Sequence, residues 1–108
     1  MKWGIPLGLI VVFVAIVVHS ASVPADDRVA QGKKIYADQC ISCHANDGSG
    51  NVPRGKAMKV PDLRTPEMQK KTDAQLTKGI LEAKRHPSFK KMGNEDLARV
   101  VAYMRTLK

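Results

Sequence analysis

The 108-residue chain is poor in several kinds of residue, and each shortage argues against a class of protein. Only two cysteines are present, Cys40 and Cys43, and no second cysteine or histidine pair is spaced to complete a structural zinc site. Aromatic residues make up 5% of the chain and are not interleaved with its basic residues, which argues against nucleic-acid binding. No segment has the alternating pattern of a β-strand, and the sequence contains neither an internal repeat nor a low-complexity tract. We therefore expect an all-α protein.

Both cysteines belong to the segment Cys40-Ile41-Ser42-Cys43-His44, which has the Cys-x-x-Cys-His spacing of a c-type haem attachment site. With two residues between them on a helical turn, both sulfur atoms can bond to one edge of a porphyrin, and the histidine that follows can reach its iron. A dithiol redox centre of the thioredoxin kind would need a strand before the motif, and a disulfide would leave His44 without a role. The motif predicts one covalent haem c bound through Cys40 and Cys43, with His44 as the proximal iron ligand.

The N-terminal residues, 1–25, have the pattern of a targeting segment. A positive charge is followed by the apolar run 5–18 and then by small residues, as in a signal peptide that is cleaved after Ala21, Ser22 or Ala25. The alternative is an uncleaved membrane anchor, but the unbroken apolar run is shorter than the roughly 20 residues of a spanning helix. We expect a signal peptide and export to the bacterial periplasm, or to the periplasmic face of the inner membrane if the segment is retained.

The remaining residues, 26–108, are enough for one small domain with a marginal hydrophobic core. A covalently held haem would supply the missing apolar bulk, and short helices would fold around it. We therefore expect one monohaem domain made of about four short helices.

Two helices are predicted at the ends of this domain. The pattern over residues 28–39 contains Gly32, which indicates that another helix approaches closely. The i, i+3, i+4 pattern from residue 94 onward places Met104 in the core. We expect the two helices to cross at four residues, Gly32, Tyr36, Val100 and Tyr103.

Shorter helices are predicted between these two. The segment Thr65-Pro66-Glu67 has a capping threonine and a proline suited to the first helical position. The segment Thr72-Asp73-Ala74-Gln75 has the pattern of a capping box for a helix that continues to about Glu82. We expect residues 53–61 to be irregular, because prolines stand at both ends, and residues 84–93 to form a loop.

Beyond the attachment motif, the chain resembles the class I c-type cytochromes of the small bacterial monohaem kind. The resemblance covers nearly all of residues 26–108. It rests on the attachment motif, Gly32-x-x-x-Tyr36, Asp47-Gly48-x-Gly50, Pro61-Asp62-Leu63, Pro87-Ser88-Phe89 and the tail at residues 101–107. It implies a helical fold around one haem and a function as an electron carrier, not an enzyme, that acts with redox protein partners.

The chain departs from that family at the second axial ligand of the iron. The family usually has a methionine directly before a Pro-x-Phe segment, but here His86 precedes residues 87–89, and Met92 follows six residues later. Three alternatives are open: His86 binds the iron, Met92 binds it instead, or the sixth position is vacant for a small ligand, as in a peroxidase-like enzyme or a sensor. We expect His86, because the residue before a proline favours an extended backbone and a neutral imidazole is a strong iron ligand. Met58 and Met68 are expected to be packing residues.

The identity of that ligand decides the expected reduction potential. Methionine ligation raises the potential of a haem, so a bis-histidine haem held by His44 and His86 is expected to have a low potential. A carrier with His44 and Met92 as ligands would have a higher one.

The chain is basic, with 18 Lys and Arg against 10 Asp and Glu and a net charge of +8. Six basic residues fall in loops expected around the haem edge: Lys56, Lys59, Lys84, Arg85, Lys90 and Lys91. Such a ring would steer the protein toward a redox partner with an acidic docking face, and the alternative is a solvated surface that keeps a small protein soluble. We expect a monomer that contacts a membrane only if residues 1–25 are retained.

Overall fold

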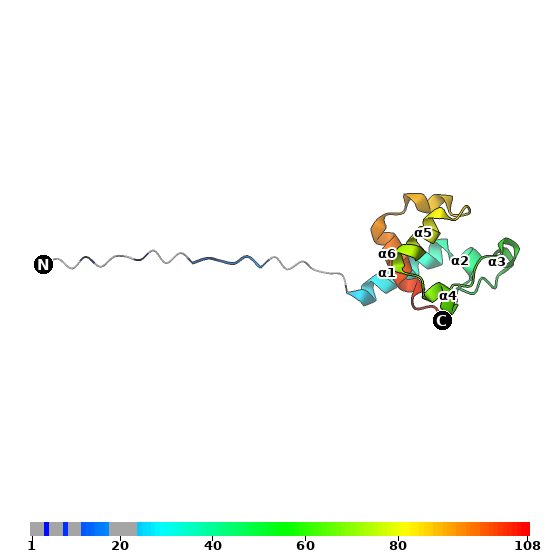
Figure 1. Ribbon diagram of the computed structural model, residues 1–108, viewed down its shortest axis with the longest axis horizontal. Helices are drawn as coiled ribbons and strands as arrows, with labels where there is room; N and C mark the ends of the chain where they lie inside the picture. Colours follow the sequence, from blue (N-terminus) through cyan, green and yellow to red (C-terminus); the bar gives the residue numbers. More distant parts are fainter. Residues whose placement is uncertain (1–3, 5–7, 9–11, 18–23) are drawn as a thin grey trace.

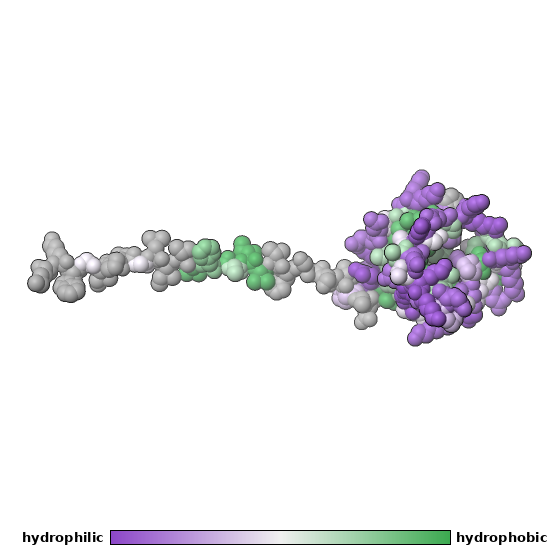
Figure 2. All heavy atoms as spheres, viewed as in Figure 1, coloured by the Kyte–Doolittle hydropathy of each residue, from purple (hydrophilic) through white to green (hydrophobic). Residues whose placement is uncertain are grey.

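The computed structural model describes residues 24–108, residues 12–17, Gly4 and Gly8. Residues 12–17 have no regular secondary structure, and their large apolar side chains are exposed, as the green segment in Figure 2 shows. The expected signal peptide or anchor falls mostly outside the described residues, together with the cleavage sites after Ala21 and Ser22. Within the described part of the chain, no helix is both long enough and apolar enough to cross a membrane.

Helices account for all the regular structure in residues 24–108, and the predicted all-α fold is confirmed (Figure 1). In chain order they are α1 (Ala25–Gln39), α2 (Ile41–His44), α3 (Pro53–Met58), α4 (Pro66–Gln69), α5 (Asp73–Glu82), the 3-10 helix η1 (Pro87–Lys91) and α6 (Asn94–Met104). The four helices predicted from the sequence are α1, α4, α5 and α6.

The helices α3 and η1 lie in stretches that were predicted to be irregular, and that prediction is wrong for both. Each helix begins with a proline, Pro53 in α3 and Pro87 in η1. Proline suits the first turn of a helix, where its missing N–H would have no partner in any case. These two prolines therefore start helices instead of breaking them.

Helices α1 and α6 cross and pack against each other at the predicted residues. A Cβ atom added at Gly32 would lie 1.9 Å from the carbonyl oxygen of Arg99 and 3.1 Å from Cβ of Tyr103, so only glycine allows the two backbones to come this close. One turn further along, the rings of Tyr36 and Tyr103 pack with their centroids 5.1 Å apart. This crossing joins the two ends of the domain.

The hydrophobic core lies beside this crossing and includes Met104, as predicted. Its buried members are Tyr36, Leu63, Leu76, Val100, Val101, Met104 and Leu107. Because they come from α1, α5, α6, the segment before α4 and the residues after α6, the core fixes the position of α5 relative to the two crossing helices.

Side-chain hydrogen bonds hold α4 and α5 in place. Thr65 and Thr72 cap the two helices as predicted, and Thr72 forms the full capping box with Gln75. The side-chain amide of Gln69 donates to the carbonyl oxygens of Leu63 and Met104, both at 3.0 Å. These bonds tie α4 to the end of α6, on the side of the core that also forms a wall of the cavity described next.

Candidate haem-binding site

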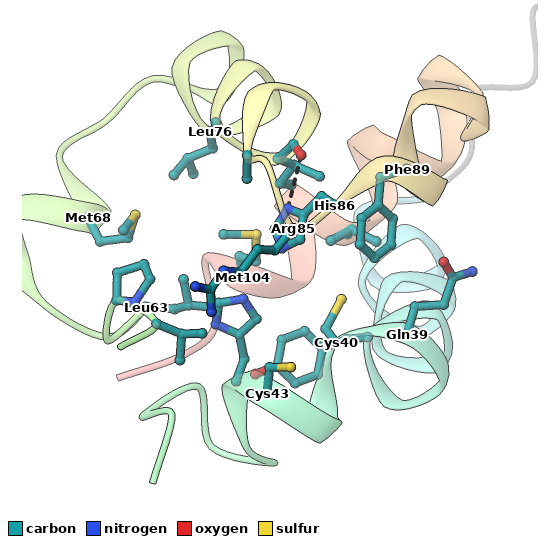
Figure 3. Close-up of a pocket in the computed structure, with 18 of the residues that line it drawn as sticks. Gln39, Cys40, Cys43, Leu63, Met68, Leu76, Arg85, His86, Phe89 and Met104 are labelled. Atoms are coloured by element: carbon teal, nitrogen blue, oxygen red, sulfur yellow. Dashed lines mark hydrogen bonds between the residues drawn. The ribbon is translucent and has the colours of Figure 1, made fainter. Parts of the chain in front are cut away.

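All five site residues predicted from the sequence line one cavity of about 680 Å³ (Figure 3). They are Cys40, Cys43, His44, His86 and Met92. Every helix of the domain contributes to the wall of this cavity. Pockets that bind cofactors and other small molecules usually measure about 300–1,000 Å³, so the volume suits a large organic group.

The two thiols of the motif reach the cavity from the junction between α1 and α2. Both cysteines are free and half-buried, and Figure 3 shows their side chains at the same edge of the cavity. Burial, and secondarily the neighbouring Cys43, raises the pKa of the Cys40 thiol to about 11. A redox-active dithiol needs a thiol with a lowered pKa, so Cys40 lacks that character.

His44 closes α2 and is buried against the cavity. Its Nδ1 atom is buried and has no hydrogen-bond partner. Burial lowers the pKa of His44, with a further contribution from His86, whereas the nearby backbone of Pro61 acts in the opposite direction. The ring is therefore neutral at neutral pH, which is the state in which an imidazole binds a metal.

The backbone after His44 is held by a buried hydrogen bond. The Tyr36 hydroxyl donates to the carbonyl oxygen of Ala45 at 2.7 Å, and burial raises the pKa of Tyr36, so the hydroxyl keeps its proton. Ala45 has a positive φ of 64°, which turns the chain sharply away from α2. A Cβ at Gly55 would lie 2.2 Å from the carbonyl oxygen of Cys43, so the chain folds back closely over the motif.

His86 enters the cavity from the opposite side, at the start of η1. Its Nδ1 lies 3.0 Å from the carbonyl oxygen of Ile80, the interaction drawn as a dashed line in Figure 3. A carbonyl can only accept, so Nδ1 carries the proton and Nε2 keeps its lone pair. The ring also packs edge-on against Phe89 at 4.9 Å between centroids, which limits its rotation.

The backbone of His86 differs from the prediction that it would be extended. Its φ is −117° but its ψ is 44°. The residue lies in a tight turn, because its N–H donates to Ala83 and its carbonyl oxygen accepts from Phe89. These two hydrogen bonds overcome the extended preference that the following proline imposes.

The two histidine rings lie close together in the cavity and meet in an edge-on arrangement. Their centroids are 6.1 Å apart and their planes are inclined by 60°. Metal–imidazole bonds are about 2.0–2.1 Å long, so two imidazoles on opposite sides of one ion have ring centres about 6 Å apart. The gap between His44 and His86 therefore has the length that one shared metal ion requires.

Comparison with known families decides what kind of protein this is. The family model for cytochrome c matches residues 29–108, most of the chain. The chain belongs to the cytochrome c family. Comparisons with curated proteins and with solved structures found no match. Membership of the cytochrome c family implies a covalently attached haem c and a function in electron transfer.

The residues of this cytochrome fit such a group. Two free thiols lie at one edge of the cavity, and the buried, neutral imidazole of His44 lines the same cavity. The cavity is also bounded by apolar side chains from the core, among them Leu63, Leu76 and Met104.

Methionines surround this cavity more fully than the sequence indicated. Met92 directly follows η1, is half-buried and packs against the core. Met58, Met68 and Met104 also line the cavity, and Sδ of Met58 lies 3.9 Å from Sγ of Cys43. Met68 packs against the core, whereas the packing role expected for Met58 stays a prediction, and both residues line the haem cavity. No local signal in the sequence places Met58 there, because its position depends on how α3 folds back toward the motif.

The side chains at the cavity wall carry only positive charge. Five basic residues line it, Arg54, Lys59, Lys71, Lys84 and Arg85, and no acidic residue does. In the described part of the chain, the ion pairs involve other basic residues and leave these five without a carboxylate partner. Of the six basic residues expected near the haem edge, Lys56, Lys90 and Lys91 are exposed but lie outside the cavity wall.

Proposed function

We propose that this cytochrome c carries single electrons on a haem attached through Cys40 and Cys43, with His44 and His86 as the two axial ligands and a low reduction potential. The bound haem supplies the one-electron couple. The observation that carries the proposal is the separation of 6.1 Å between the centroids of the two imidazole rings, both of which line the cavity. The thiols would hold the cofactor covalently, and the two imidazoles would bind its metal.

His86 suits the role of second ligand better than Met92 does. The Ile80 carbonyl accepts a hydrogen bond from Nδ1, which leaves Nε2 as the nitrogen whose lone pair can bind the iron. Met92 lies at the other end of η1, where its side chain contributes to the packing of the core. Replacing the usual thioether by a second imidazole favours the ferric state, which is the reason for the low potential.

The spectrum of the haem-loaded protein tests this assignment. The ferric wild type is expected to be low-spin without the sulfur-to-iron charge-transfer band at the red end of the visible spectrum. His86→Ala is expected to lose the low-spin spectrum, His86→Met to gain the charge-transfer band and a higher potential, and Met92→Leu to change neither.

The opposite pattern would contradict the proposal. A charge-transfer band in the wild type that Met92→Leu removes would assign the ligand to Met92. Rapid and complete binding of carbon monoxide to the ferrous wild type would indicate a vacant sixth position, as in an enzyme or a sensor.

We also propose that the basic residues of the cavity wall guide an acidic redox partner to the haem. Lys84 and Arg85 are exposed, adjoin His86, and have no carboxylate partner among the described residues. Oxidation of the ferrous protein by the anion ferricyanide should slow as ionic strength rises, because salt screens the attraction. Lys84→Gln and Arg85→Gln should weaken that dependence, whereas Lys33→Gln on the exposed face of α1 should affect it less. A response to salt that is flat, or the same in all variants, would contradict this proposal.

The cellular location is a further part of the proposal. The large apolar side chains of Val12, Phe13, Val14 and Ile16 are exposed, which supports the removal of this segment with a signal peptide, residues 1–25, during export to the bacterial periplasm. The mass of the protein purified from the periplasm should lack this segment, and gel filtration should give a monomer. A full-length mass found only in the membrane fraction would instead indicate the anchor.

A further inference from the structure

Gly79 occupies an unfavourable place for a glycine, in the interior of α5. In the middle of a helix, glycine lowers the equilibrium constant for folding about fivefold relative to alanine (about 1 kcal/mol). A glycine in such a position needs a reason, and the reason is usually a close neighbour or an unusual backbone conformation.

The other glycines of the helical domain have reasons within the protein. At Gly32 and Gly55 a Cβ atom would overlap a backbone carbonyl oxygen, at 1.9 Å and 2.2 Å respectively. Gly48 and Gly50 have φ values of 82° and 73°, which side chains disfavour. Gly93 is the residue that precedes α6, where glycine is well tolerated.

Gly79 has neither kind of reason. A Cβ atom at this position would meet no protein atom within 4 Å, and its φ is not positive. The open space beside it is the haem cavity, which Gly79 lines together with Leu76, Ile80 and Ala83. These four residues lie along one face of the helix. Because Gly79 has no side chain, the backbone is uncovered in the middle of that face.

The bare backbone adjoins the group that orients His86. Ile80 follows Gly79 in the chain, and its carbonyl oxygen contacts Nδ1 of His86 at 3.0 Å. A group that presses against α5 at Gly79 therefore meets the same turn of helix that holds the imidazole. The distance between α5 and a group bound in the cavity therefore also determines how far the His86 ring extends toward that group.

We propose that Gly79 is a haem-contact residue, whose missing side chain lets the porphyrin lie against the α5 backbone and lets His86 reach the iron. The inference rests on the proposal that the haem occupies this cavity. It adds a position outside the attachment motif and the axial ligands to the residues that determine the geometry of the site.

The test uses the haem-loaded full-length protein with Gly79→Ala and Gly79→Leu. Alanine and leucine are both good helix formers, so at a position that faces only solvent each should raise the folding constant about fivefold. The inference predicts the reverse for leucine, a fall of about 5- to 100-fold from overpacking, and at most a small gain for alanine. Ala74→Leu is the control, because Ala74 is exposed on the same helix and lies outside the cavity wall.

Spectroscopy separates a contact with the haem from a general loss of stability. If Gly79 sets the reach of His86, Gly79→Leu will lose part of the low-spin ferric spectrum and bind carbon monoxide faster than the wild type, and Ala74→Leu will do neither. A stable Gly79→Leu protein, or a destabilised one with an unchanged spectrum, overturns the inference. If the leucine variant does not accumulate with haem, Gly79→Ala is the test. A fivefold gain in its stability with an unchanged spectrum overturns the inference.

Failure of this inference can be distinguished from failure of the proposed function. Haem staining of the wild type on a denaturing gel reports covalent attachment independently of residue 79. If the wild type stains for haem and is low-spin, but the Gly79 variants do not show the predicted effects, only the role of Gly79 is refuted. A wild type without haem removes the proposed function as well.

Discussion

The crossing of α1 and α6 allows a quantitative prediction at Gly32. In Gly32→Ala, the new Cβ would lie 1.9 Å from the carbonyl oxygen of Arg99, a distance that must grow to about 3 Å before the contact is tolerable. The two helices must therefore move apart by about 1 Å at the point where they are closest. This displacement also loosens the contact between the rings of Tyr36 and Tyr103.

Two opposing effects set the size of the loss in stability. Overpacking of this kind costs about 1–3 kcal/mol, and the gain in helix propensity on replacing glycine offsets up to about 1 kcal/mol. Because the overlap is with backbone atoms, which cannot rotate away, the cost falls in the upper part of its range, and we expect a net loss of about 1–2 kcal/mol from a total that is typically about 5–15 kcal/mol.

Equilibrium unfolding of the haem-loaded protein in guanidinium chloride measures this loss. The midpoint should fall in Gly32→Ala, with little change in Lys33→Ala, which alters an exposed side chain on the same helix. A Gly32→Ala protein as stable as the wild type would refute the reasoning, because the backbones could then separate without cost.

Three further changes are expected to have measurable effects. Tyr36→Phe removes the donor to the Ala45 carbonyl and should cost about 1 kcal/mol in denaturant unfolding, and no change would show that the bond contributes nothing. Thr72→Ala removes the capping box of α5 and should lower stability by about 1 kcal/mol in the same assay, with rescue by serine. The hydrogen bond from Arg64 holds the pKa of Asp62 below its ordinary 3.8, so its contribution is present above about pH 4 and is lost as the pH falls through the lowered pKa. Asp62→Asn should therefore flatten the dependence of the urea midpoint on pH below about pH 4, and an unchanged slope would contradict the ion pair's role.

Features of the fold that depend on neighbouring residues could be predicted from the sequence. The caps at Thr65 and Thr72 follow from hydrogen bonds within one helical turn, and the structure contains both. The crossing at Gly32 was also predictable, because a glycine on an otherwise apolar helix face indicates a close neighbour. The attachment motif is local too, because its five residues are consecutive in the chain and their spacing alone indicates the chemistry.

Features that depend on distant contacts could not be predicted. The conformations of Ala45 and Lys59, both with positive φ, depend on where the chain must turn around the motif. The extended backbone expected for His86 yields to hydrogen bonds with Ala83 and Phe89. Arg54 lines the haem cavity only because α3 folds back toward the motif, and no local pattern signals that movement.

The pairing of α1 with α6 has a consequence for how the newly made chain folds. These helices are the first and the last of the domain, and each is a main packing partner of the other. An isolated helix as short as α1 is only marginally stable in water. Until residues 94–104 are available, α1 lacks its main packing partner, and only contacts such as those of Tyr36 with Leu63 and Leu76 in the core can hold it. We therefore expect the α1–α6 crossing, and with it the stable fold of this cytochrome, to form only once its final helix is present.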